Sequence, residues 1–489
     1  MNGAATRRSS SIEARAASSL WRRLVLPTIV ALAAAMALFV GKEVSQGNLL
    51  IGLLSAATLA GIAIFRYLGL PAWCSLLLIA AVAARGPRTA LGLPAIADFL
   101  HYPIALLFAL AAADRRPRAA SRTPGRWLTG LLLVVLLSAI AHPDNPMRTL
   151  LFLLIAGEPL LIIWAISRWV ADQDTLRTVG AITLVLVATE VALGVYQGVT
   201  YGWADPVQGT LAGHGAGAHV LGSLFALVLF ILAAGIRARR LNPILGGVGT
   251  AACLGMIIAT GSMSVLVIAT FAVVIQPFLA GPSVGAAVRP RRLSAITITI
   301  FLGAAALAFA ATWVPGVYGR AARLATAGRL DPEIAIIRDR AGSDPLAVLL
   351  GSGPGTSSSR ASLLLALGVE EGSPLAFLGL EPTDLGRELA AADAFSEARY
   401  GGSVESVTSG VLGVVGDLGV VGLVAWGVLL FAIWRRLGKS RSWLAPAARS
   451  ALLMAAALSF VDNWLEYPEF AVPLAILIGF VVSDIPDGA

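Results

Sequence analysis

The chain has 489 residues, of which 57% are hydrophobic and only 13% are charged, and its formal net charge is +8. Water-soluble proteins carry about 25% charged residues, so this composition excludes a soluble globular protein. The positive charge does not indicate a nucleic-acid partner, because basic loops commonly orient membrane proteins. The two cysteines lie in separate apolar runs, which argues against a disulfide framework.

Apolar runs of bilayer-spanning length follow one another along most of the chain. A span needs about 20 apolar residues, and the runs predict an all-α polytopic membrane protein with about 12–14 transmembrane helices. The expected helices cover 24–40, 49–65, 70–84, 97–113, 127–141, 150–166, 179–197, 218–236, 243–260, 262–279, 293–312, 411–434, 445–461 and 470–483. The run at 70–84 is short and could be a re-entrant segment or a half-span.

These runs divide the chain into parts of different composition. We expect a disordered basic tail at 1–23, a membrane domain at 24–312, a polar loop of short helices at 313–410, three further helices at 411–483 and a short tail at 484–489. Lys and Arg concentrate in alternate connections. By the positive-inside rule, both termini are cytoplasmic and the 313–410 loop is extracytoplasmic in a multi-pass protein of the cell membrane.

The long outer loop holds the clearest candidates for chemistry. An arginine-rich stretch precedes a glycine turn, and the residues concerned are Arg320, Arg329, Arg338, Arg340, Gly351, Gly353 and Gly355. Guanidinium groups bind phosphate oxygens through paired hydrogen bonds and stay charged at any working pH. The amides of a glycine turn can form an anion nest. The alternative is a solvated loop whose arginines pair with neighbouring carboxylates.

Polar residues at other outer edges complete the candidate site. His214 and His219 flank a glycine-rich segment and could hydrogen-bond an acceptor. They are too few to form a metal site, so neither a metal nor another cofactor is expected. Asp462 and Glu466 lie in the last outer loop, where a carboxylate could act as a base on an acceptor hydroxyl.

Glu158 and Glu190 lie inside predicted spans. Carboxylates within a membrane are costly and usually have a function or a partner. Each could be a general base, a proton relay or the partner of an arginine, and a structural polar contact is the alternative for both.

Several short motifs, in order along residues 150–483, resemble the O-antigen ligase and polymerase family. Gly328-Arg329-Leu330, Asp344-Pro345-Leu346 and the glycine turn that begins at Gly351 resemble its outer-loop signature. Arg340 and Gly351, with ten residues between them, fit its looser Arg-x10-Gly pattern. Three further segments resemble family motifs, namely Gly209-Thr210-Leu211, Thr260-Gly261-Ser262 and 416–422.

The resemblance implies metal-independent glycosyl transfer at the outer face of the membrane. The donor would be a polyprenyl-diphosphate-linked oligosaccharide and the acceptor a glycan or a lipid, with membrane lipids as the surroundings. Arg320, Arg329, Arg338 and Arg340 would stabilise the departing diphosphate.

The sequence also departs from the family pattern. Met263 stands where the family has Arg, and Thr408-Ser409 stand where ligases have His-Asn. These departures favour a polymerase-like or divergent transferase. Two alternatives stay open: a transporter of lipid-linked glycans that uses Glu158 and Glu190, and a catalytically inactive family member.

Overall fold

The computed structural model describes residues 68–83, 99–115, 118–143, 146–169, 171–203, 206–211, 217–279, 344–357, 359–362, 409–460 and 463–485, with single positions at 334, 335, 337, 338 and 342. These residues form helices and no strand. Residues 1–69 and 107–116 make one compact unit and the rest of the chain a second, larger one. The helices below belong to the larger unit, apart from the second half of α5.

Most of the predicted apolar runs are helical. The described α-helices are α3 (Leu70–Leu78), α5 (His101–Ala113), α6 (Ala119–Ala141), α7 (Pro146–Ser167), α8 (Gln173–Tyr201), α9 (Gly217–Arg237), α10 (Pro243–Ala259), α11 (Met263–Ile275), α15 (Pro345–Leu350), α18 (Gly410–Leu437), α19 (Ala445–Leu458) and α20 (Pro468–Ser483). A π turn (Ile79–Ala83) continues α3, and short 3₁₀ turns are η4 (Gly209–Leu211), η5 (Gln276–Leu279) and η8 (Trp464–Glu466).

Five of these helices, α6, α7, α8, α9 and α18, are long and apolar enough to cross a bilayer. The protein is therefore a membrane protein. Helices α3, α5, α10, α11, α19 and α20 are apolar but shorter. The predicted spans at 24–40, 49–65 and 293–312 lie outside the described residues.

Several helices extend beyond the apolar runs from which they were predicted. Helix α6 begins at Ala119 rather than near Trp127, and α8 begins at Gln173. Asp172 caps α8 by accepting a hydrogen bond from the Thr175 amide at 2.7 Å. A run of hydrophobic residues marks only the apolar stretch of a helix, whereas its ends are set by caps and by polar turns.

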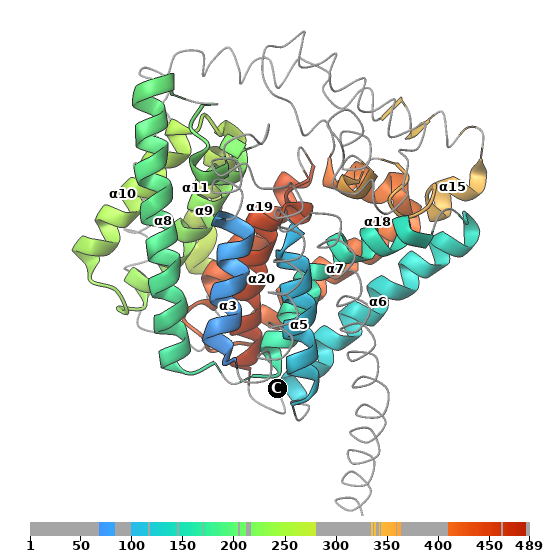
Figure 1. Ribbon diagram of the computed structural model, residues 1–489, viewed down its shortest axis with the longest axis horizontal. Helices are drawn as coiled ribbons and strands as arrows, with labels where there is room; N and C mark the ends of the chain where they lie inside the picture. The colour runs from blue at the N-terminus through green and yellow to red at the C-terminus, as the bar shows by residue number, and fades with distance from the viewer. Residues whose placement is uncertain are drawn as a thin grey trace, which may run out of the picture. The chain divides into compact units, whose positions relative to one another are not determined.

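Helix α20 lies at the centre of the larger unit. Every residue from Pro468 to Ser483 is buried, as expected of a helix that is apolar on all sides. It packs against α7 and α19, and α6 packs against α7 (Figure 1). Helix α8, by contrast, exposes most of its apolar side chains.

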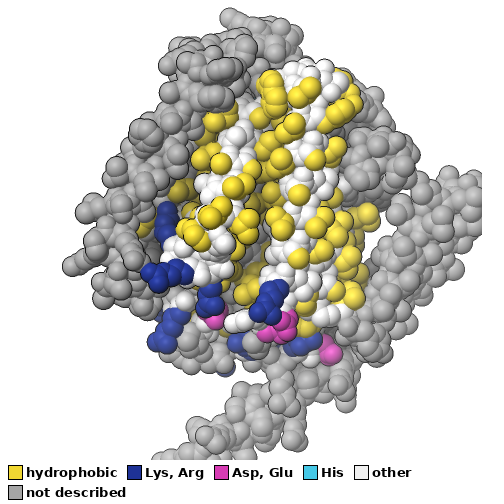
Figure 2. Space-filling model, turned by 90° about the vertical axis from the view of Figure 1, so that its left-hand side faces the viewer, with side chains coloured by type: hydrophobic (Ala, Val, Ile, Leu, Met, Phe, Trp, Pro, Cys, Tyr) yellow, Lys and Arg dark blue, Asp and Glu magenta, His cyan; other side chains and the backbone are white. Residues whose placement is uncertain are grey.

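Charged side chains collect at one end of the described helices. On the face shown in Figure 2, hydrophobic side chains are spread over the described helices, and Lys and Arg, with some Asp and Glu, gather along the lower edge. This distribution resembles an apolar membrane band bordered by basic residues.

Helix α18 is broken at Gly419, which has φ +67°. The break lets the chain of α15 approach closely. A Cβ on Gly419 would lie 2.4 Å from backbone atoms of Leu349, and a Cβ on Gly351 would lie 2.2 Å from the backbone of Asp417. Only glycine fits at these two positions, so the break fixes the glycine turn against α18.

A similar close approach holds the turn that precedes α9. The amide of Thr210 donates to Glu190 Oε2 at 2.9 Å, and the Thr210 hydroxyl also donates to this carboxylate. Gln197 accepts hydrogen bonds from the amides of Gln208 and Gly209. Of the interpretations open for Glu190, the structure shows a polar contact that holds η4 against α8.

Gly209→Ala is expected to destabilise the protein by roughly 2–4 kcal/mol. Gly209 has φ +60°, and an added Cβ would lie 1.9 Å from Glu190 Oε2. The measurement is the thermal unfolding midpoint in detergent. Gly180→Ala on α8 is the control, because nothing lies within 4 Å of a Cβ there. Equal midpoints for the two variants would contradict the structural role of Glu190.

Candidate functional site

The glycine turn closes around the carboxylate of Asp417, which is fully buried in α18. The Gly355 amide donates to Asp417 Oδ2 and the Ser357 amide to Oδ1, each at 2.7 Å. Ser352 adds two hydrogen bonds to the carbonyl of Gly416, from its amide at 2.8 Å and from its hydroxyl at 3.0 Å. The amides of the turn do bind an anion, as a glycine turn can, but the anion belongs to this chain.

Helix α6 supports the same region. The Ser138 hydroxyl donates to the Asp417 carbonyl at 2.9 Å. At the end of α6, His142 Nε2 lies 2.9 Å from Asp344 Oδ2. Asp344 also caps α15 by accepting from the Leu346 amide at 2.9 Å. The hydrogen bond from His142 lowers the pKa of Asp344, and the bonds from the α15 amides lower it further.

Arg360 contacts both Glu466 and Tyr467. The Arg360 amide donates to Glu466 Oε2 at 2.6 Å, and the Arg360 guanidinium lies 4.1 Å from the centroid of the Tyr467 ring. Such a position allows a cation–π interaction. Burial raises the pKa of Glu466 to about 7; the Arg360 amide opposes the shift, and the charge of Asp417 adds to it.

A buried histidine–carboxylate pair lies nearby. His101 Nδ1 and Glu158 Oε1 are 2.7 Å apart, and the two side chains are 2% and 4% exposed. The Tyr102 ring lies 4.0 Å from the His101 ring, centroid to centroid. Tyr102 is within electrostatic range of Glu158, Arg360, Glu466 and Glu469. We call these six residues, His101, Tyr102, Glu158, Arg360, Glu466 and Glu469, the polar cluster.

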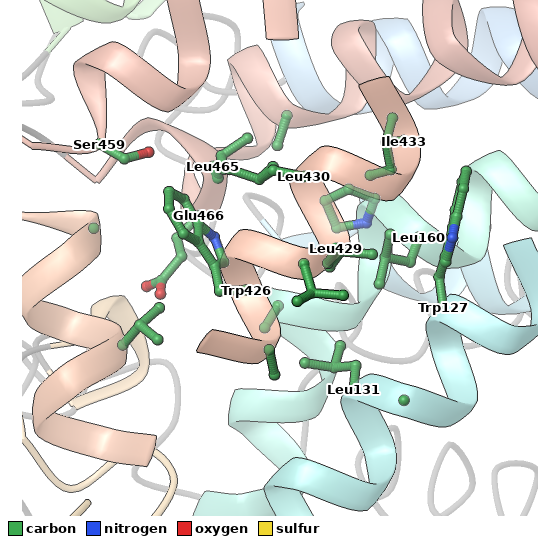
Figure 3. Close-up of a pocket in the computed structure, with 18 of the residues that line it drawn as sticks. Trp127, Leu131, Leu160, Trp426, Leu429, Leu430, Ile433, Ser459, Leu465 and Glu466 are labelled. Carbon is green, nitrogen blue, oxygen red and sulfur yellow. The ribbon is translucent and has the colours of Figure 1, made fainter. Parts of the chain in front are cut away.

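The polar cluster borders an apolar cavity of about 360 Å³ between α6, α7, α18, α19 and α20. Ser459, Asn463 and Glu466 line it near the loop before α20, and Arg126 and Trp127 line it near the start of α6. Figure 3 shows Glu466 and Ser459 on one side of the cavity and Trp127 on the other. Between them lie mainly aliphatic side chains, among them Leu131, Leu160, Leu429, Leu430 and Ile433. The cavity is mainly apolar, with polar residues at the two places named above.

The structure places some of the predicted site residues and not others. Arg320, Arg329, Arg340, His214 and Asp462 lie outside the described residues. Arg338 is exposed, and His219 lies half-buried in the first turn of α9. Gly351, Gly353 and Gly355 all have positive φ and form the turn around Asp417. Glu466 is joined to Arg360, and Glu158 to His101.

The sequence did not predict Asp417, Arg360 or Tyr102 as site residues, although Asp417 belongs to the 416–422 motif and Arg360 is one of the loop arginines. A signal existed for Asp417, because it is a carboxylate inside an apolar run and could have been treated like Glu158 and Glu190. No such signal marked Arg360 among the loop arginines or Tyr102 at the start of its helix. Within the described ranges, no group of three or more His, Cys, Asp or Glu residues is placed to hold a metal ion.

The fold and the site define an all-α membrane protein with a buried polar cluster beside an apolar cavity. No protein-family model matches the chain, and no curated protein is significantly similar to it in sequence.

Proposed function

We propose that the protein is a glycosyltransferase of the O-antigen ligase and polymerase type. It would move or polymerise an oligosaccharide from a polyprenyl-diphosphate donor at the outer face of the cytoplasmic membrane. The observation that carries the proposal is the position of Glu466 at the polar end of the apolar cavity, where its carboxylate accepts the Arg360 backbone amide and lies within electrostatic range of the Arg360 guanidinium. A base, a cation and a hydrocarbon-lined space thus occur side by side.

The reaction needs a base and a stabilised leaving group. The acceptor hydroxyl oxygen attacks the anomeric carbon and forms the new glycosidic bond. The bond from that carbon to the diphosphate oxygen breaks, and its electron pair leaves with the diphosphate. Glu466 would take the hydroxyl proton, because a carboxylate with a pKa of about 7 is both ionised and basic near neutral pH.

Arginine would supply the positive charge that stabilises the diphosphate. Arg360 is the described candidate, and Arg320, Arg329, Arg338 and Arg340 stay as predictions from the sequence. Fixed guanidinium groups aimed at a developing negative charge are an effective form of transition-state stabilisation. No divalent cation is needed for this role.

The apolar cavity supports a lipid-linked donor. Its aliphatic walls suit a polyprenyl chain, and its polar end near Glu466 suits the head group. The proposal requires a multi-pass protein whose termini are cytoplasmic and whose 313–410 loop is extracytoplasmic. The distribution of Lys and Arg along the chain supports that orientation.

One observation favours a different function. A buried carboxylate with a histidine partner, such as Glu158 with His101 at 2.7 Å, is also suited to carry protons in a transporter. The transporter would move a lipid-linked glycan and would form no new glycosidic bond.

The two functions are separated by an assay in detergent. We expect purified protein to transfer a lipid-linked oligosaccharide without an ion gradient, and EDTA to leave the rate unchanged, because arginine supplies the charge. Product is measured by chromatography of the labelled glycan. Movement of the glycan lipid across sealed vesicles only under a proton gradient, with no product in detergent, would favour the transporter.

A further inference from the structure

A second apolar crevice of about 310 Å³ lies between α5, α6 and α7. Leucines from α6 and α7 form most of its lining, and Glu158 and Tyr102 are the ionisable side chains among its lining residues. Leu106, Leu132 and Leu150 also line it and are 44%, 43% and 49% exposed. Exposed leucines on membrane-type helices face lipid, so the crevice is accessible from the hydrocarbon.

The crevice and the first cavity lie on two sides of the same helix pair. Leu131 of α6 lines both spaces. Tyr102 and Glu158 line the crevice and Glu466 lines the cavity, and Tyr102 is within electrostatic range of both carboxylates. Two hydrocarbon-lined spaces therefore border one polar cluster.

The charges of the two spaces differ. Neither Lys nor Arg is among the residues that line the crevice, whereas the Glu466 end of the cavity lies within electrostatic range of the Arg360 guanidinium, and Arg126 lines the opposite end. A diphosphate in the crevice would meet the Glu158 carboxylate with no cation among the lining residues to offset the repulsion. A hydroxyl group, by contrast, can donate a hydrogen bond to that carboxylate.

We propose that the crevice binds the hydrocarbon chain of a second lipid, whose uncharged, hydroxyl-bearing head group reaches the polar cluster. This lipid is the acceptor, and in that respect the proposal rests on the proposed glycosyl transfer. The two substrates then enter from opposite sides of α6 and α7. The hydrocarbon chain of the donor lies in the cavity and that of the acceptor in the crevice. One hydroxyl of the acceptor head group contacts Glu158, and the reacting hydroxyl reaches Glu466 through the polar cluster.

Three glycines allow a matched test. Gly157 lines the crevice and Gly130 lines the cavity. A Cβ at Gly157 would meet only Leu131, at 3.9 Å, and a Cβ at Gly130 would meet nothing within 4 Å. Leucine at either position should therefore fill its own space without a backbone clash. Gly180 on α8 is exposed, and Gly180→Leu is the control.

The probes are a long-chain alcohol and farnesyl diphosphate, each carrying a diazirine, applied to the whole protein in lipid nanodiscs. Crosslinked peptides are identified by mass spectrometry. We expect Gly157→Leu to lower labelling by the alcohol about tenfold, which corresponds to about 1.4 kcal/mol of binding. Labelling by farnesyl diphosphate should persist in that variant. Gly130→Leu should give the reverse pattern, and Gly180→Leu should resemble the wild type.

Three results would overturn the proposal. The first is unchanged alcohol labelling in Gly157→Leu. The second is labelling of α5–α7 crevice peptides by farnesyl diphosphate. The third is crosslinking of two copies of the chain through Leu132 or Leu150, which would make the crevice a subunit interface.

The transfer reaction gives an independent readout. Gly157→Leu should raise the KM for a hydroxyl-bearing lipid acceptor and leave the KM for the donor unchanged. If the labelling pattern holds and no lipid acceptor is glycosylated, the crevice is a lipid site and the proposed glycosyl transfer is wrong. Transfer to a water-soluble glycan alone, with no alcohol labelling in the crevice, would leave the transfer standing and reject the acceptor site.

Discussion

Asp417→Ala is expected to lower the stability of the protein by about 2–6 kcal/mol, because two buried amides lose their acceptor at about 1–3 kcal/mol each. These amides belong to Gly355 and Ser357, and each lies 2.7 Å from an oxygen of Asp417. The glycine turn should detach from α18. Limited proteolysis of segment 344–362 and the thermal unfolding midpoint in detergent measure the effect.

Asp417→Asn should have a smaller effect, since one amide oxygen still accepts a hydrogen bond while the NH₂ group faces the second amide. Asp174→Ala is the control, because Asp174 is an exposed residue paired with exposed Arg177 at 3.2 Å. Its stability should change by no more than about 0.5 kcal/mol. If Asp417→Ala behaves like Asp174→Ala, the turn does not depend on the carboxylate.

Glu466→Gln is expected to slow glycosyl transfer about 10²- to 10⁴-fold, the usual contribution of a general base. Glutamine keeps an oxygen that can accept the Arg360 amide, so the local fold should persist. Asp484→Asn, at the other end of α20, is the control and should retain full activity. If the Glu466→Gln enzyme turns over at the wild-type rate, at equal protein level, Glu466 is not the general base.

The dependence on pH provides a second check on Glu466. The carboxylate is ionised above its pKa of about 7, so the wild-type rate should rise as the pH increases through about 7 and then level off. The Glu466→Gln enzyme should lose this rise. A wild-type rate that is flat between pH 5 and 9 would contradict a base with this pKa.

The stability of the folded protein should also depend on the ionisation of Glu466, but it should fall as the pH rises, whereas the rate increases. Because the pKa of Glu466 is raised from its ordinary value of 4.5, the folded protein binds a proton that the unfolded chain releases between pH 4.5 and about 7. Stability therefore falls as the pH rises through this window. Glu466→Gln should abolish that fall, which separates a catalytic effect from a folding defect.

The sequence determined the class of the protein and the position of most of its helices. Apolar runs predicted α7, α9, α10 and α18 to within a few residues, because hydropathy is a local property of the chain. Helix ends were less accurate, as at α6, where polar residues continue the helix beyond the apolar run. The intramembrane carboxylates Glu158 and Glu190 were also evident from the sequence.

Only the tertiary structure decided which groups meet. Glu158 pairs with His101, which is 57 residues away, and the carboxylate of Asp417 receives the amide of Gly355, which is 62 residues away. The sequence predicted a turn that can bind an anion, and the tertiary structure shows that its amides at Gly355 and Ser357 bind the Asp417 carboxylate. The break at Gly419 and the packing of α6, α7 and α20 bring these distant residues together. Hydropathy and motif spacing are local properties of the chain, so they do not indicate which distant residues become partners.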